Sequence, residues 1–233
     1  MSVEPAYFLV RNTLVPLMRL LFRFRFFGLD KIPKRGPLII APNHVSNFDP
    51  ICMGVLVDHA GRRPRFLAKA SLWRTPFLRW IFSNARQIPV ERGSGQRAPL
   101  EAAIAAVKRG ECVVLYPEGT ITRNPDLTPM EGKKGIARLA LATGAPVVPV
   151  AQWGPHWYIA KYHRSSFRPG RLLMFKAGDP MTFEAPPDKH DDPELLREVS
   201  DRVMAELDRM VRELQKIHPE GAAIPALREQ RDG

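Results

Sequence analysis

The chain has 233 residues, of which 45% are hydrophobic and 25% are charged. These values exclude wholesale disorder, and the length favours one large domain. The formal net charge of +11 predicts anionic partners, namely nucleic acid, an anionic membrane surface or phosphorylated substrates. Cys52 and Cys112 are too few for a disulfide framework and are expected to be reduced thiols, and no Cys/His cluster indicates a metal site.

Residues 1–28 are expected to form an N-terminal amphipathic membrane-binding segment. Tyr7–Phe27 is rich in Phe, Leu and Val and is interrupted by four arginines, Arg11, Arg19, Arg23 and Arg25. We expect a helix with a kink at Pro16, lying at a membrane interface with its arginines on lipid phosphates. The alternative is a helix docked on the protein's own core. No stretch of the sequence is expected to span a bilayer.

The rest of the chain alternates short strand-like and helical runs. The strand-like runs are Pro37–Ala41, Arg65–Ala68, Gln87–Val90, Cys112–Tyr116, Val147–Ala151 and Leu172–Phe175, and the helical runs are Ile51–Val57, Pro76–Phe82, Arg97–Arg109, Gly132–Ala142 and a long helix from Pro193. This alternation predicts a single α/β domain with a mixed, mostly parallel sheet covered by helices. We expect this domain to cover residues 29–217, followed by a flexible tail at 218–233. Pro149 favours an edge strand or a bulge for the fifth run.

The first segment that can carry chemistry follows the first buried strand-like run. It contains Asn43, His44, Ser46 and Asp49, so a histidine and an aspartate stand five residues apart in a loop. A carboxylate on imidazole Nδ1 would fix the tautomer and leave the other nitrogen as a general base. The alternative is that Asp49 only caps a helix beginning at Pro50 and that His44 is an ordinary loop residue.

Two further strand ends carry candidate binding groups. Pro117, Glu118, Gly119, Thr120 and Arg123 follow the Cys112–Tyr116 run, where the glycine permits close backbone approach and the other groups supply donors for an oxyanion. Arg92 follows the Gln87–Val90 run and can hold a phosphate through two hydrogen bonds. Taken singly, both features are also compatible with ordinary surface turns.

These segments, in this order and spacing, resemble the glycerolipid acyltransferase family, and more narrowly the 1-acyl-glycerol-3-phosphate acyltransferases. Asn43, His44, Ser46 and Asp49 match the NHxSxxD block of that family, and residues 117–120 match its Pro-Glu-Gly-Thr block, with Tyr116 as the preceding aromatic residue. Arg92 falls where the family has an arginine for the acceptor phosphate. The family usually has Arg-Ser directly after Glu-Gly-Thr, whereas Ile121 and Thr122 precede Arg123 here.

The resemblance implies transfer of a fatty acyl group from acyl-CoA or acyl carrier protein to 1-acyl-glycerol-3-phosphate, giving phosphatidic acid. His44 would be the base and Asp49 its orienting group, while Arg92, Glu118, Gly119, Thr120 and Arg123 would position the acceptor. No cofactor besides the thioester co-substrate is expected. The expected location is the cytoplasmic face of the cell membrane, peripheral or monotopic.

Three alternatives remain at the level of sequence. A same-family enzyme could use another acceptor, such as glycerol-3-phosphate or a glycolipid. A nucleic-acid-binding module would suit the charge, but no signature of one is present, so nucleic acid is not expected as a partner. A serine or cysteine hydrolase lacks the G-x-S-x-G motif.

Overall fold

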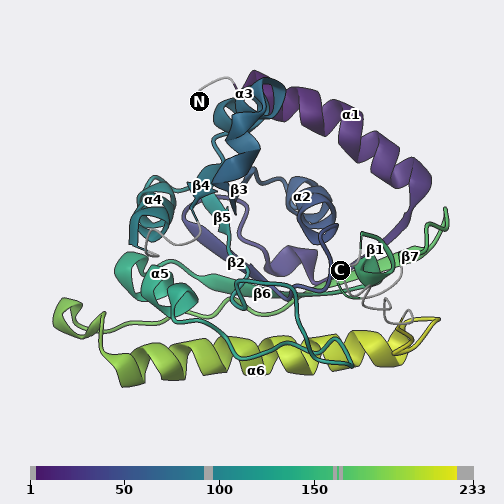
Figure 1. Cartoon of the computed structure of the whole chain (residues 1–233). Coiled ribbons are helices and arrows are strands. Elements are labelled where there is room, and N and C mark those ends of the chain that lie inside the picture. The colour runs from purple at the N-terminus through teal and green to yellow at the C-terminus, as the bar shows by residue number, and fades with distance from the viewer. Residues whose placement is uncertain (1–3, 92–96, 160–161, 163–164, 225–233) are drawn as a thin grey trace, which may run out of the picture.

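A seven-stranded sheet forms the centre of the protein (Figure 1). The structure is a computed structural model, and it describes residues 4–91, 97–159, 162 and 165–224. The strands are β1 (Arg23–Phe27), β2 (Leu38–Pro42), β3 (Pro64–Lys69), β4 (Ile88–Val90), β5 (Cys112–Val114), β6 (Val147–Trp153) and β7 (Leu172–Ala177). Their order is β1-β7-β6-β2-β5-β3-β4. Only β6 and β7 pair antiparallel; the other neighbours are parallel. The predicted single α/β domain with a mixed, mostly parallel sheet is confirmed.

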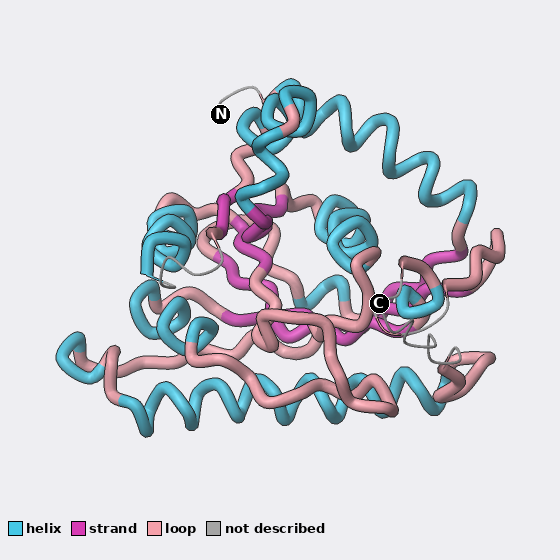
Figure 2. The backbone as a smooth tube through the Cα atoms, viewed as in Figure 1, coloured by secondary structure: helices cyan, strands magenta, loops and turns pink. Residues whose placement is uncertain are grey.

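Helices cover both faces of the sheet (Figures 1 and 2). They are α1 (Pro5–Leu21), α2 (Asp49–His59), α3 (Pro76–Asn84), α4 (Arg97–Lys108), α5 (Gly135–Thr143) and α6 (Pro193–Ile217). Successive strand residues point to opposite faces. Ile39 of β2 therefore packs in one core with α4, α5 and α6, whereas Ile40 packs in another with α1 and α2. This burial on both sides explains the continuous apolar runs of the central strands.

The C-terminal helix follows the sequence prediction closely. Asp192 caps α6 by accepting hydrogen bonds from the backbone N–H groups of Glu194 and Leu195 at 2.9 and 3.0 Å. Apolar residues recur every three or four positions along its buried face. The next residues, 218–224, were predicted to belong to a flexible tail. They lie against the body instead, where Gly221 O accepts a hydrogen bond from Trp153 Nε1 at 2.9 Å.

Two predictions about local structure are wrong. The N-terminal helix ends at Leu21, and Arg23–Phe27 forms β1 at the edge of the sheet, with Arg23 and Arg25 exposed and Phe24 and Phe26 half-buried. Pro149 lies in β6, which is an interior strand. Its missing N–H is tolerated because the ladder between β6 and β7 begins at Val150, so Pro149 falls in a gap between this ladder and an isolated bridge at Val147.

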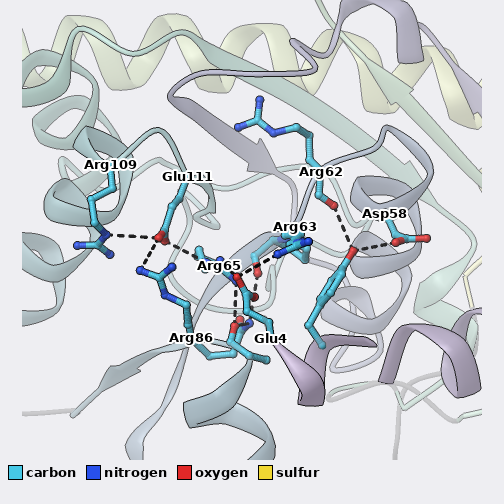
Figure 3. Close-up of polar contacts among 12 residues, drawn as sticks. Glu4, Asp58, Arg62, Arg63, Arg65, Arg86, Arg109 and Glu111 are labelled. Atoms are coloured by element: carbon cyan, nitrogen blue, oxygen red, sulfur yellow. Dashed lines mark hydrogen bonds and ion pairs between the residues drawn. The ribbon is translucent and has the colours of Figure 1, made fainter. Parts of the chain in front are cut away.

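A network of buried charges fixes the start of α1 to the sheet (Figure 3). The two carboxylate oxygens of Glu4 accept hydrogen bonds from Arg65 at 2.7 and 2.8 Å, and Arg65 Nε donates to Glu111 at 3.0 Å. Glu4 and Arg65 are each 3% exposed. Arg86 and Arg109 pair with Glu111 from the outside. We call Glu4, Arg65 and Glu111 the clamp.

The remainder of α1 has two apolar sides. One side packs on the body through Ala6, Leu14, Val15, Met18 and Leu21. Arg11 binds Asp58 at 2.6 Å and Arg19 binds His59 at 2.7 Å, so these two arginines engage α2. The other side exposes Leu9, Leu17 and Leu20, and neighbouring α3 exposes Phe77 and Trp80. The helix is therefore docked, and it also presents apolar side chains outward.

None of the helices within the described residues is long and apolar enough to cross a membrane.

Candidate active site

The candidate catalytic loop begins where β2 ends. β2 and β5 are adjacent parallel strands, so the segments that follow them, from Asn43 and from Leu115, meet at the same edge of the sheet. In open α/β sheets this carboxyl edge is where ligands bind. The topology thus brings together the two motifs that the sequence singled out.

His44 and Asp49 are in direct contact. His44 Nδ1 lies 2.8 Å from Asp49 Oδ2, and this same oxygen accepts the backbone N–H groups of Val45 and Ser46 at 2.6 and 2.9 Å. The Asp49 side chain is fully buried, whereas that of His44 is 16% exposed. The loop therefore wraps around the carboxylate and leaves one edge of the imidazole reachable from outside.

Asp49 does not cap α2, so the alternative interpretation of this residue from the sequence is wrong. The N-cap residue is Phe48, and Asp49 is the first residue of the helix, with its carboxylate turned back to the preceding loop. An oxygen that already receives two backbone N–H groups acts as an acceptor, so we place the proton of His44 on Nδ1 and the lone pair on Nε2. Burial raises the pKa of the Asp49 carboxyl, and the hydrogen bond from His44 opposes this effect.

Glu118 holds the candidate catalytic loop from the β5 side. Its Oε1 accepts the backbone N–H of His44 at 2.9 Å, and its Oε2 accepts that of Met130 at 3.0 Å. Burial raises the pKa of Glu118 to about 7, although both backbone donors favour its charged form. Glu118 touches the backbone of His44 and not its ring, which fits an orienting residue better than a second base.

The other residues of the NHxSxxD block support the loop. Asn43 exchanges hydrogen bonds with Gln152 of β6: its Oδ1 accepts the Gln152 backbone N–H at 2.8 Å, and its backbone oxygen accepts Gln152 Nε2 at 2.7 Å. Ser46 Oγ donates to the carbonyl of Tyr158 and accepts the backbone N–H of Phe48 at 3.0 Å. These contacts tie the loop to β6 and to the turn after it.

Tyr116 forms one wall of the imidazole site. Its ring stacks on that of His44 with centroids 4.2 Å apart and an interplanar angle of 28°. An aromatic residue at this position therefore limits the rotation of the imidazole.

The predicted acceptor-binding residues occupy different settings. Gly119 has φ of +67° and lies exposed at the turn after Glu118, while Thr120 is half-buried. Pro117 is buried, and its carbonyl accepts the backbone N–H of Lys133 at 2.9 Å. Arg123 is exposed and separated from the turn by buried Ile121 and Thr122. Arg92 lies outside the described residues.

Sequence reasoning missed three residues that complete the site. Gln152 and Met130 contact Asn43 and Glu118 from distant parts of the chain, and Lys133 lies against Gly119. Their neighbours in sequence carry no motif. Only the apolar strand around Gln152 signals its place, since a lone amide within a buried strand requires hydrogen-bond partners.

An open cavity of about 730 Å³ lies farther along the same edge, beyond β3 and β4. Its lining includes three cations, Lys69, Arg74 and Arg79, together with Trp73 and Glu91. Lys69, Arg74 and Arg79 form no ion pair within the described residues. The cavity therefore has a positive lining with an aromatic wall.

The model of the Acyltransferase family matches residues 23–153, which is more than half of the chain, and the chain belongs to that family.

Particular proteins of this kind are similar to the chain. The crystal structure of PlsC, the 1-acyl-sn-glycerophosphate acyltransferase of Thermotoga maritima, superposes with a TM-score of 0.69 at 28% identity, covering 92% of this chain and 84% of that one. The 1-acyl-sn-glycerol-3-phosphate acyltransferase of Borreliella burgdorferi is 31% identical over 58% of this chain and 52% of its own length. The lyso-ornithine lipid O-acyltransferase of Pseudomonas aeruginosa is 31% identical over 50% of this chain and 43% of its own length. The matched region thus spans about half the length of these curated relatives.

Proposed function

We propose that this protein transfers a fatty acyl group from an acyl thioester to the free hydroxyl of 1-acyl-glycerol-3-phosphate, giving phosphatidic acid. The observation that carries the proposal is the 2.8 Å contact between His44 Nδ1 and the buried carboxylate of Asp49, with the imidazole partly exposed at the sheet edge. Family membership and the activities for which the Thermotoga and Borreliella proteins are named support the same reaction.

The chemistry needs one base and two protein-held substrates. His44 Nε2 accepts the proton of the acceptor hydroxyl as its oxygen attacks the thioester carbonyl carbon, and Asp49 stabilises the resulting imidazolium. The tetrahedral intermediate collapses with cleavage of the carbon–sulfur bond. The imidazolium then returns its proton to the departing thiolate, so the residue ends each cycle neutral.

The acceptor is positioned by the turn that follows β5. Glu118 holds the backbone of His44, and the two residues that follow it in the turn, Gly119 and Thr120, are exposed and half-buried. Arg92 and Arg123 supply further cations for the phosphate in this proposal, and a guanidinium suits that role because it can donate two parallel hydrogen bonds.

Both possible acyl donors are anionic, since coenzyme A carries phosphates and an acyl carrier protein carries acidic residues. The cavity lined by Lys69, Arg74 and Arg79 is suited to them because it is wide, open and positively charged. Either coenzyme A or an acyl carrier protein meets this requirement. The thioester is already an activated acyl group, so no cofactor is required beyond this co-substrate.

The acceptor lies in a membrane, and the protein exposes apolar residues on α1 and α3. Leu9, Leu17, Leu20, Phe77 and Trp80 would enter the interface, with the net charge of +11 drawing the protein to anionic lipid. We therefore propose peripheral or monotopic binding at the cytoplasmic face of the cell membrane. An anionic membrane accounts for the positive charge without a nucleic-acid partner.

A second acceptor class is favoured by one relative and one departure from the family pattern. The Pseudomonas relative is named for acylating a lyso-ornithine lipid, and Arg123 is displaced from the position that follows Glu-Gly-Thr. The alternative proposal is a same-family enzyme that uses another acceptor, such as glycerol-3-phosphate or a glycolipid.

The test is a product analysis with one isotope-labelled acyl thioester and a panel of acceptors. Mass spectrometry should find the label in phosphatidic acid when 1-acyl-glycerol-3-phosphate is supplied. Label only in another lipid would reassign the acceptor, and label on no lipid alcohol would overturn the proposed reaction.

A further inference from the structure

The segment after Thr120 leaves the active-site turn and then returns to it. Met130 N–H binds Glu118 Oε2 at 3.0 Å on the return, and Lys133 N–H binds the carbonyl of Pro117 at 2.9 Å. The backbone of Lys133 is therefore fixed beside the turn that holds His44. A residue fourteen positions beyond Gly119 in sequence becomes its neighbour in space.

The side chain of Lys133 crosses directly over Gly119. A Cβ atom added to Gly119 would lie 2.9 Å from Lys133 Nζ and 3.1 Å from both Cδ and Cε. The positive φ of Gly119, +67°, also disfavours any side chain there. The glycine of the Glu-Gly-Thr motif thus makes room for a lysine as well as for close backbone approach.

The ammonium group of Lys133 is available for a ligand. It forms no ion pair or hydrogen bond within the described residues, and Lys133 is exposed. The carboxylate next to Gly119 in sequence, that of Glu118, already uses both oxygens for backbone N–H groups, and the carboxylate of Glu131 pairs with Arg197 at 2.6 Å. An unpaired cation beside a catalytic loop attracts an anionic group of the substrate.

We propose that Lys133 binds the phosphate of the acceptor and sets the preference for phosphorylated acceptors. The inference rests on the proposed function. In 1-acyl-glycerol-3-phosphate the phosphate is only a few covalent bonds from the attacking hydroxyl, so its cation must lie next to His44. Lys133 meets this condition because its side chain lies over Gly119, and the preceding residue, Glu118, binds the backbone N–H of His44. It supplies the charge at the turn where the family places an arginine and this chain has Ile121.

The experiment compares Lys133→Met with Lys134→Met, which removes the same charge from the next residue, at the start of α5. Initial rates are measured in neutral detergent micelles, with acyl-CoA and 1-acyl-glycerol-3-phosphate varied separately, and also with 1-acylglycerol, which lacks the phosphate. Lys133→Met should raise the KM for the phosphorylated acceptor by about 10–100-fold, because one charge–charge contact is lost. The KM for acyl-CoA and the rate on 1-acylglycerol should match those of the control, and Lys133→Arg should restore most of the affinity.

Equal KM values for the phosphorylated acceptor in the two methionine variants would overturn the role of Lys133, as would a rise confined to acyl-CoA. Lys133→Gln provides a second neutral side chain, and thermal unfolding of each variant shows whether the fold is kept. The activity of the wild-type protein distinguishes a failure of the proposed function from a failure of the inference about Lys133. If it acylates only 1-acylglycerol, the proposed function fails. If it acylates the phosphorylated acceptor and the variants do so equally well, only the inference about Lys133 fails.

Discussion

Two buried carboxylates, Glu4 and Asp49, face nitrogen groups in different ways. Glu4 gives both oxygens to the guanidinium of Arg65, which stays charged at any physiological pH. Asp49 gives one oxygen to His44 and to two backbone N–H groups, and its Oδ1 has no hydrogen-bond partner within the described residues. A permanent cation makes an anchor, whereas a titratable partner with one free nitrogen can pass a proton.

The pKa values of Glu4 and Asp49 are also shifted in opposite directions. Burial acts to raise the pKa of Glu4, but the hydrogen bond and the charge of Arg65 outweigh it and lower that pKa. Burial dominates at Asp49 and raises its pKa. The directions differ because two arginines, Arg65 and Arg63, oppose the effect of burial on the pKa of Glu4, whereas Asp49 is more deeply buried and faces one titratable histidine.

The largest expected effect is on catalysis at Asp49. Asp49→Asn leaves one oxygen for the three donors at the Oδ2 position, but it removes the negative charge that stabilises the His44 imidazolium and puts an unpaired amide NH₂ at the buried Oδ1 position. We expect kcat to fall by roughly 10²–10⁴-fold with little change in either KM. Steady-state kinetics measure this, and Asp58→Asn is the control because Asp58 binds Tyr7 and Arg11 away from the site. A kcat within twofold of the wild type would show that Asp49 does not orient the base.

The second effect is on stability at the clamp. Arg65→Met leaves the buried carboxylate of Glu4 with only the longer contact to Arg63 at 3.4 Å, and we expect the free energy of unfolding to fall by about 3–5 kcal/mol. The remaining folded protein should keep its kcat. Urea denaturation measures the change, and Arg109→Met, which removes a half-exposed partner of Glu111, should cost less than about 1 kcal/mol. Equal losses of unfolding free energy in the two variants would show that the clamp stabilises the fold no more than a surface ion pair does.

The third effect is a pH dependence of the free energy of unfolding that is caused by Glu118. Its pKa of about 7 exceeds the ordinary value of 4.5, so the folded state holds the proton more tightly than the unfolded state. Stability from this group is present below the unfolded pKa and falls as pH rises from about 4.5 to 7, by up to ~3 kcal/mol. Glu118→Gln should remove this slope. Urea denaturation of the wild type and of Glu118→Gln at pH 5 and pH 7.5 tests this prediction. If the unfolding free energies of the two proteins change equally with pH, the pKa of Glu118 is not raised.

The smallest expected effect is on membrane binding by the exposed side of α1. Leu20 is 82% exposed, so Leu20→Glu should leave the stability unchanged and weaken binding to anionic vesicles by about tenfold. Ala205→Glu adds the same charge to an exposed position of α6 and serves as the control. Vesicle sedimentation measures the binding. If Leu20→Glu and its control bind alike, α1 does not enter the interface.

The sequence was sufficient to predict the contact between His44 and Asp49 because the residues of this loop are local. His44 and Asp49 are five positions apart, and the turn formers around them confine the chain. Most strands were also predicted, since buried parallel strands are short apolar runs between breakers. The alternation of Arg and Phe over residues 23–27 was a period-two signal for β1, but the apolar helix before it masked that signal.

Contacts between distant parts of the chain could not be predicted. The pairing of Glu4 with Arg65 joins residues 61 positions apart, and that of Asn43 with Gln152 joins residues 109 positions apart. Charged and amide residues suit many surface positions, so their identity does not reveal burial. The place of Lys133 depends on the path of the segment after Thr120, which no local pattern specifies.

The central claim is that His44 removes the proton of the acceptor hydroxyl, and single-turnover kinetics test it most directly. Purified His44→Ala and wild type are mixed with labelled acyl thioester and 1-acyl-glycerol-3-phosphate, and formation of phosphatidic acid is followed. His190→Ala is the matched control, because the His190 side chain bonds to Ala185 O, away from the site. The account predicts a rate at least about 10²-fold lower for His44→Ala alone, with the fold retained. A rate for His44→Ala equal to that of the control would contradict it.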